Sequence, residues 1–204
     1  MKKLIIIGAG GHGKVIADIA LKLNTFDSIA FLDDGDKKEC MGLKVIGKVS
    51  DKLKYVNSAE IFVAIGNSDQ RKKLIEELLE AGASVPVLIH PSAVIGNDVA
   101  IGQGTAIMAG AVINPCSKLG KGVILNTCSS IDHDCVVEDF CHLAVGVRLA
   151  GTVTLGTNVW LGVASAVKNN VSICANTVIG AGAVVVDNIV ESGTYVGVPA
   201  KILR

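Results

Sequence analysis

His133 is the residue of this chain whose neighbours most favour acid–base chemistry. It stands in the run Asp132-His133-Asp134, between two carboxylates that can raise the basicity of an imidazole and fix its tautomer. A neutral imidazole is the usual base near pH 7 for taking a proton from an attacking amine. Adjacent residues of a regular strand point to opposite faces, so Asp134 reaches His133 only if the chain turns there. The alternative is a surface histidine paired with its neighbours.

A glycine-rich loop near the start of the chain is suited to binding phosphate. The loop Gly8–Gly13 reads GAGGHG, and Asp33 stands twenty residues after it, a spacing that formally matches a dinucleotide fingerprint. NAD is not expected, because about eighty residues cannot supply a full dinucleotide fold and a hydride-transfer site. Backbone N–H groups at a helix start instead predict a diphosphate cradle, in which the imidazole is either a donor or an exposed loop residue. The residues expected to bind the diphosphate are Gly10, Gly11, His12 and Gly13.

Polar residues also follow two apolar runs, residues 28–32 and 60–65, that are expected to form strands. Carboxylates suit phosphate poorly, but they accept hydrogen bonds from a nucleobase N–H, a ribose hydroxyl or a sugar ammonium group. Open α/β sheets bind ligands at the carboxyl ends of their strands, so these loops are predicted to bind the same ligand as the glycine loop. The residues concerned are Asp33 and Asp34 after one strand, and Gly66, Asn67 and Arg71 after the other.

The elements that carry these loops predict a small Rossmann-like α/β domain over residues 1–88. Three apolar runs predict parallel strands, and two amphipathic or charged segments predict helices, the second of which ends at Gly82. The expected strands are 3–7, 28–32 and 60–65, and the expected helices run from the glycine loop to about residue 23 and over 69–81.

The rest of the chain, residues 89–204, carries an uninterrupted six-residue period. Because a helix repeats about every 3.6 residues and a strand alternates every two, this period indicates a repeat architecture. We expect a β-helix of roughly five coils, about 25 Å tall, with each aliphatic residue pointing inward. A β-sandwich, the alternative, would not keep strict register over so many units. The series is Ile95, Ile101, Ile107, Ile113, Leu119, Leu125, Ile131, Val137, Leu143, Leu149, Leu155, Leu161, Val167, Ile173, Ile179 and Val185.

The composition argues against several classes of partner. The formal net charge is zero, so no broad basic field would attract nucleic acid or anionic lipid. No apolar run reaches the length of a membrane span. The six cysteines show no CxxC spacing and are expected to be reduced, which predicts a cytoplasmic protein.

Several motifs spread over the whole chain resemble those of the NeuD/PglD-type sugar acyltransferases. They are GAGGHG, FLDD, FVAIGNSDQRKKL, LIHPSAVIG, GVILNTCSSIDHDCVVEDFCHLAVGVRLAGTVTLG and YVGVPAK. The resemblance implies a nucleotide-sugar-binding α/β domain, a left-handed parallel β-helix, and a homotrimer with active sites between subunits. It also implies acetyl-CoA as co-substrate, with neither a metal nor NAD.

Within this family the chain looks most similar to the branch that N-acetylates UDP-4-amino-4,6-dideoxy-GlcNAc in bacillosamine synthesis. It departs slightly, with GAGGHG where GASGHG is frequent and Asp134 where a glutamate can stand. Sialic acid O-acetyltransferases share the DHDC run, so transfer to a sugar hydroxyl is the alternative reaction.

The resemblance assigns roles to residues of the second domain. His133 is expected to be the base, oriented by Asp134. His142 would face the acetyl-CoA thioester, Gly151 would offer a backbone N–H and room for pantetheine, and Lys201 would lie near the adenosine or a phosphate. Three residues keep two interpretations each. These are Asn126 (catalytic network or coil backbone), Trp160 (trimer or cofactor contact) and Arg148 (CoA phosphate ligand or solvated charge).

Overall fold

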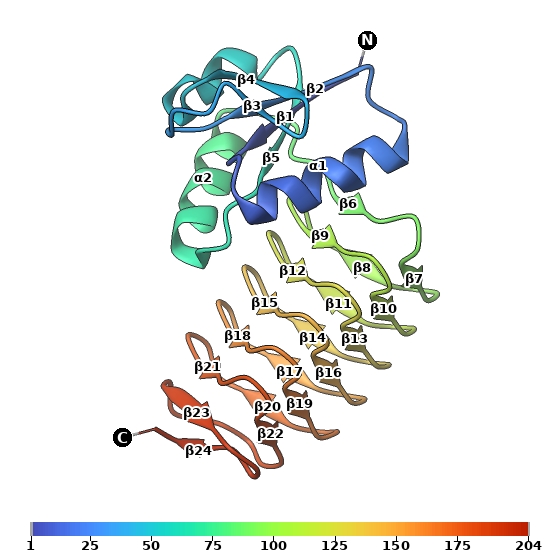
Figure 1. The fold of residues 1–204 in the computed structure, drawn as a ribbon. Helices are drawn as coiled ribbons and strands as arrows, with labels where there is room; N and C mark the ends of the chain where they lie inside the picture. The colour runs from blue at the N-terminus through green and yellow to red at the C-terminus, as the bar shows by residue number, and fades with distance from the viewer. Residues whose placement is uncertain (1, 204) are drawn as a thin grey trace. The chain divides into compact units, whose positions relative to one another are not determined.

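The computed structural model describes residues 2–203 and divides into two compact units, residues 1–91 and 92–204 (Figure 1). The first is an α/β unit and the second is a left-handed parallel β-helix. The functional division expected at residue 88 stays a prediction.

The α/β unit is built on a sheet of order β3-β4-β2-β1-β5. Parallel pairing joins β1 (Lys3–Ile7), β2 (Ser28–Leu32), β4 (Leu43–Gly47) and β5 (Glu60–Val63). The three expected strands are present, and the third ends two residues earlier than the sequence suggested. The structure adds β4 and its short antiparallel neighbour β3 (Glu39–Cys40).

Two helices pack against this sheet. Helix α1 (Gly11–Leu23) contacts β1 and buries Ile16 and Ile19, and it ends where Asn24 adopts a left-handed backbone. Helix α2 (Ser68–Glu80) contacts β5 and buries Ile75 and Leu78. A 3₁₀ segment η1 (Val49–Tyr55) and a short strand β6 (Leu88–Ile89) complete the unit. The carboxyl ends of β1, β2 and β5 therefore lead into the loops that the sequence singled out.

The β-helix confirms the six-residue period. Within the described residues, sixteen two-residue strands fall into sheets of order β7-β10-β13-β16-β19-β22, β8-β11-β14-β17-β20 and β9-β12-β15-β18-β21. Each strand ends on an aliphatic residue of the series, and strands pair with residues eighteen positions apart, as in Ile113 with Ile131. The strands are β7 (Val94–Ile95), β8 (Ala100–Ile101), β9 (Ala106–Ile107), β10 (Val112–Ile113), β11 (Lys118–Leu119), β12 (Ile124–Leu125), β13 (Ser130–Ile131), β14 (Val136–Val137), β15 (His142–Leu143), β16 (Arg148–Leu149), β17 (Thr154–Leu155), β18 (Trp160–Leu161), β19 (Ala166–Val167), β20 (Ser172–Ile173), β21 (Val178–Ile179) and β22 (Val184–Val185).

Every corner of the coil places one residue in the left-handed backbone region, with φ between 55° and 71°. Glycine, asparagine and aspartate tolerate this conformation best, which explains their frequency at the corners. This second six-residue series was not predicted from the sequence. Its members are Asp98, Gly104, Gly110, Cys116, Gly122, Cys128, Asp134, Phe140, Gly146, Thr152, Asn158, Ala164, Asn170, Asn176 and Gly182.

Small polar side chains share the interior of the β-helix with the aliphatic ones. The buried Thr105 hydroxyl donates to the carbonyl of Gly120 at 2.9 Å, and that of Ser117 donates to the carbonyl of Asp132 at 2.8 Å. Buried hydroxyl groups are destabilising unless they are paired, so these bonds make the narrow polar core tolerable.

The last coil is followed by a short hairpin. Strand β23 (Thr194–Val196) pairs in parallel with β21, and β24 (Lys201–Ile202) pairs with β23 in the antiparallel sense. This hairpin covers a strand edge that would otherwise be open to pairing. Among residues 2–203, no helix is long and apolar enough to cross a membrane.

Candidate active site

The Asp132-His133-Asp134 run lies at a corner between β13 and β14. Asp134 has a left-handed φ of 58°, so the chain turns there as the interaction with His133 requires. Its Oδ2 lies 2.7 Å from Nδ1 of His133. Because Nδ1 of His133 is hydrogen-bonded to this carboxylate, Nε2 is the ring nitrogen that could accept a proton from a reactant.

A second carboxylate supports the same imidazole. The Asn114 side-chain amide donates to Oδ1 of Asp132 at 2.7 Å, and the His133 backbone N–H donates to the same oxygen at 2.9 Å. These two bonds, the Asn114 bond first, lower the pKa of Asp132 and keep it ionised. The Asp134 hydrogen bond, followed by the charge of Asp132, raises the pKa of His133 above its ordinary value. His133 is therefore a stronger base than a free imidazole.

Gly151 lies one coil beyond His133 and is buried against it. In the ladder, the Thr152 N–H donates to the His133 carbonyl at 2.9 Å, which places residue 151 beside the histidine. A Cβ built on Gly151 would lie 2.6 Å from Nε2 of His133.

His142 forms a second polar group on another face of the β-helix. Its ring stacks on that of Trp160 with centroids 5.8 Å apart and an interplanar angle of 3°. The side-chain nitrogen of Asn126 lies 3.4 Å from Nε2 of His142, and Asn126 Oδ1 accepts the Thr127 N–H at 2.8 Å. Asn126, which the sequence linked to the His133 network, is therefore joined to His142 in this structure, because the two belong to neighbouring coils of one face.

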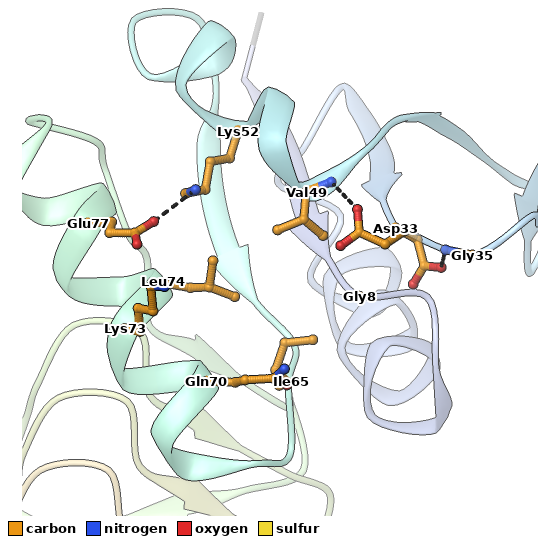
Figure 2. Close-up of a pocket in the computed structure, with 11 residues that line it drawn as sticks. Gly8, Asp33, Gly35, Val49, Lys52, Ile65, Gln70, Lys73, Leu74 and Glu77 are labelled. Carbon is orange, nitrogen blue, oxygen red and sulfur yellow. Dashed lines mark hydrogen bonds and ion pairs between the residues drawn. The ribbon is translucent and has the colours of Figure 1, made fainter.

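The α/β unit contains a cavity of about 460 Å³ at the carboxyl ends of its strands. Its lining includes Gly8, Asp33 and Asp34, as the loop positions predicted, together with residues of η1 and α2 (Figure 2). Figure 2 shows Lys52 reaching from η1 toward Glu77 of α2, and their charged groups lie 2.9 Å apart. Sequence reasoning missed this ion pair because its partners are far apart in the chain and belong to segments without a motif.

Asp33 holds the glycine loop in place. Its Oδ2 accepts the Ala9 N–H at 2.7 Å and its Oδ1 accepts the Gly35 N–H at 2.9 Å. The Ala9 bond is the main reason that the pKa of Asp33 is lowered. Lys37, which the sequence analysis also missed, donates to the Ala9 carbonyl at 2.9 Å and so brings a positive charge to the same loop.

Asp34 contacts the protein through one carboxylate oxygen and also lines the cavity. Its Oδ1 accepts the Val49 N–H at 2.9 Å, and Lys48 donates to its carbonyl at 2.8 Å. Since one oxygen is used by η1, the other carboxylate oxygen is the part suited to a ligand.

The glycines of the loop have two different functions. Gly10 and Gly11 are exposed with open space where a side chain would begin, and α1 starts without a side-chain cap. Gly13 is buried, and a Cβ there would lie 2.0 Å from the carbonyl oxygen of Gly8; its contact with phosphate stays a prediction. Glycine at this position is required for close packing. His12 lies half-buried in the first turn of the helix.

The loop after β5 is held by hydrogen bonds among its own residues and the first turns of α2. The Asn67 side chain accepts the Gln70 N–H at 2.9 Å and caps α2. The Arg71 side chain is fully buried and donates from Nη1 to the carbonyls of Ile65 at 3.0 Å and Gly66 at 2.8 Å. The buried guanidinium thus shapes the loop from inside, and contact between Arg71 and a ligand stays a prediction.

Comparison with known proteins gives a family. Residues 3–78 match the family model described as the PglD N-terminal domain. The acetyltransferase domain of PglB from Neisseria gonorrhoeae FA1090 is 38% identical, with all of both chains covered and a TM-score of 0.97. The chain belongs to the PglD-type sugar acyltransferases.

Other members of the PglD-type group are also similar. PerB from Caulobacter crescentus, solved in complex with CoA and GDP-perosamine, is 37% identical over 100% of this chain and 98% of that one, with a TM-score of 0.92. The UDP-N-acetylbacillosamine N-acetyltransferase of Bacillus subtilis is 35% identical over 53% of this chain. The matched segment spans 52% of that enzyme's length.

Two basic residues of this PglD-type chain, Arg148 and Lys201, are candidate CoA contacts on the basis of the sequence. Arg148 donates to the carbonyls of Cys128 and Val147, so its guanidinium is attached to the coil backbone. Lys201 is exposed on β24 in the terminal hairpin. In residues 2–203, no cluster of three or more His, Cys, Asp or Glu side chains forms a metal site.

Proposed function

We propose that this protein transfers the acetyl group of acetyl-CoA to the amino group of a nucleotide-linked sugar of the UDP-4-amino-4,6-dideoxy-GlcNAc type. The observation that carries the proposal is His133, whose Nδ1 lies 2.7 Å from a carboxylate while its Nε2 remains for the reacting proton. The names of the similar proteins support the donor and the class of acceptor.

The two units divide the work in this proposal. The α/β unit binds the nucleotide sugar, with the diphosphate at Gly10, Gly11 and the uncapped start of α1. Lys37 supplies positive charge at the same loop. The cavity beside Asp33 and Asp34 receives the nucleoside. The β-helix supplies the base.

The chemical step needs one proton acceptor. The neutral amine attacks the thioester carbonyl carbon and forms the C–N bond while its proton passes to Nε2 of His133. The tetrahedral intermediate then collapses, the C–S bond breaks, and the CoA thiolate takes a proton from the imidazolium. Asp134 stabilises the imidazolium and holds the ring, so neither a metal nor a redox cofactor is required.

The donor side is assigned to the second polar group. His142, fixed between Asn126 and the Trp160 ring, would face the thioester, and Gly151 and Lys201 would lie along the CoA chain. A homotrimer with acetyl-CoA between subunits completes the site. Light scattering on the purified protein should therefore give three times the chain mass.

A thiol-release assay tests the proposal. The protein is incubated with acetyl-CoA and with UDP-, GDP- and dTDP-linked amino sugars in turn, with and without a chelator. We expect full activity in chelator and the highest kcat/KM with a UDP-linked 4-amino sugar. Turnover with free sialic acid alone would assign the chain to the O-acetyltransferases instead.

The fall of kcat at acidic pH, the acidic limb of the pH profile, should follow the protonation of His133. The rate falls as pH drops through the pKa of His133, because the protonated ring cannot accept a proton. Asp134→Asn removes the main interaction that raises this pKa, so the limb should move to lower pH while kcat at the optimum falls. The profiles of kcat against pH for both proteins check this. A limb that stays in place would show that another group is titrating.

Asp34→Asn should weaken acceptor binding selectively. Asparagine keeps an oxygen for the Val49 N–H but replaces the other acceptor oxygen with an NH2 donor, so the charged hydrogen bond to the ligand is lost. We expect the KM of the nucleotide sugar to rise about tenfold, with little change in that of acetyl-CoA. Asp36→Asn, at an exposed position two residues away, is the control. Equal effects on both substrates would exclude Asp34 from the acceptor site.

A further inference from the structure

We infer that Gly151 is a positioning residue whose missing side chain leaves the space in which the His133 ring lies. The inference rests on the proposed role of His133 as the base. A Cβ at residue 151 would approach Nε2 at 2.6 Å, Cε1 at 2.7 Å and Cδ2 at 3.2 Å of that ring. Real Cβ atoms are essentially never found within 3.0 Å of a heavy atom outside their own residue and its chain neighbours, so a methyl group and this ring position exclude each other.

The backbone at this position does not itself require glycine. Gly151 has no left-handed φ, unlike Thr152 next to it at the corner. The equivalent residues of other coils, eighteen positions apart, carry side chains: besides His133 they are Asn97, Pro115, Asn169 and Asp187. The constraint at residue 151 therefore comes from the histidine and not from the coil.

Movement of the ring would disturb its hydrogen bond with Asp134. Asp134 holds Nδ1 at 2.7 Å on one edge, and the contacts with residue 151 involve Nε2 and the carbons on the other. A methyl group would have to push the ring by several tenths of an ångström or turn it out of its rotamer. Either movement displaces Nε2, the atom proposed to take the proton, and lengthens the hydrogen bond that orients it.

Gly151→Ala tests the inference through a double-mutant cycle with His133→Ala. Displacement of a catalytic group by about 1 Å can reduce the rate by about 10²-fold, so we expect kcat to fall by roughly 10- to 100-fold in the otherwise unchanged protein. In the His133→Ala background the same change should have no further effect, because no ring remains to be displaced. Asn169→Ala, at the equivalent position one coil further, is the matched control and should keep wild-type kcat.

The double-mutant cycle distinguishes steric positioning of the His133 ring from direct contact between Gly151 and acetyl-CoA. Alanine retains the backbone N–H of residue 151, and its methyl group points at the His133 ring, so the Kd of acetyl-CoA should change much less than kcat. A fall in kcat of the same size in both backgrounds, or a loss of acetyl-CoA binding alone, would overturn the inference.

Imidazole NMR supplies a readout that needs no turnover. In Gly151→Ala the His133 signal, identified by its absence from His133→Ala, should titrate at lower pH than in wild type because its bond with Asp134 is weakened. An unchanged titration would contradict the inference. If His133→Ala kept full turnover, the proposed base would be wrong, whereas a shifted titration would still support the steric role of Gly151.

Discussion

Replacing His133 with alanine should lower kcat by roughly 10²–10⁴-fold, the range in which a positioned general base contributes. The substitution removes the nitrogen proposed to take the proton and leaves Asp134 without its partner at 2.7 Å. Water or another base can partly substitute, so a residual rate should persist. Because the side chain is exposed, the β-helix should remain intact.

Steady-state kinetics and direct binding together check this result. The Kd of acetyl-CoA and the thermal midpoint of unfolding should match wild type, and the acidic limb of the pH profile should disappear. Lys118→Ala, which truncates an exposed side chain of β11, is the control and should keep full activity. Wild-type turnover in His133→Ala would remove the base from the mechanism.

Arg71→Ala should be the most destabilising of the changes considered, by about 3 kcal/mol. The fully buried guanidinium donates to the carbonyls of Ile65 and Gly66, and truncation leaves both oxygens without this donor beside a new cavity. The loop after β5 also lines the ligand cavity at Ile65, so the KM of the nucleotide sugar should rise as well.

Urea unfolding separates the two units in this test. Far-UV circular dichroism follows the helices, which lie in the α/β unit, whereas the single tryptophan, Trp160, lies in the β-helix. We expect the circular dichroism midpoint to fall in Arg71→Ala and to stay near wild type in Lys72→Ala, whose side chain is exposed. An unchanged midpoint in the arginine variant would show that these hydrogen bonds do not support the loop.

The β-helix could be predicted in detail because one rule repeats in it. Each inward aliphatic residue stacks on residues eighteen positions away, so the period alone determined the strands and their register, as in Leu125 with Leu143. The condition attached to Asp134 was met for a related reason: it occupies one of the regular left-handed corners. The corner series was not predicted because its residue types range from glycine and asparagine to cysteine, phenylalanine and threonine, and so share no single chemical pattern.

The α/β unit was less predictable because side-chain direction depends on tertiary packing. Arg71 and Asn67 have residue types that suit a ligand, yet one points inward and the other caps its own helix. Strands β3 and β4 were not predicted because β3 has only two residues and β4 is short, contains a lysine and ends on a glycine. The Lys52–Glu77 pair forms only when η1 meets α2.

Mass spectrometry of the reaction product tests the central claim most directly. The wild-type protein is incubated with acetyl-CoA and a UDP-linked 4-amino-4,6-dideoxy-GlcNAc, and the nucleotide sugar is recovered and treated with hydroxylamine. The account predicts a product heavier by one acetyl group that resists hydroxylamine, because an amide is stable to it, and almost none of this product with His133→Ala. An acetyl group that hydroxylamine removes would identify an ester and contradict N-acetylation, and an unmodified sugar beside released CoA would contradict acetyl transfer to this acceptor.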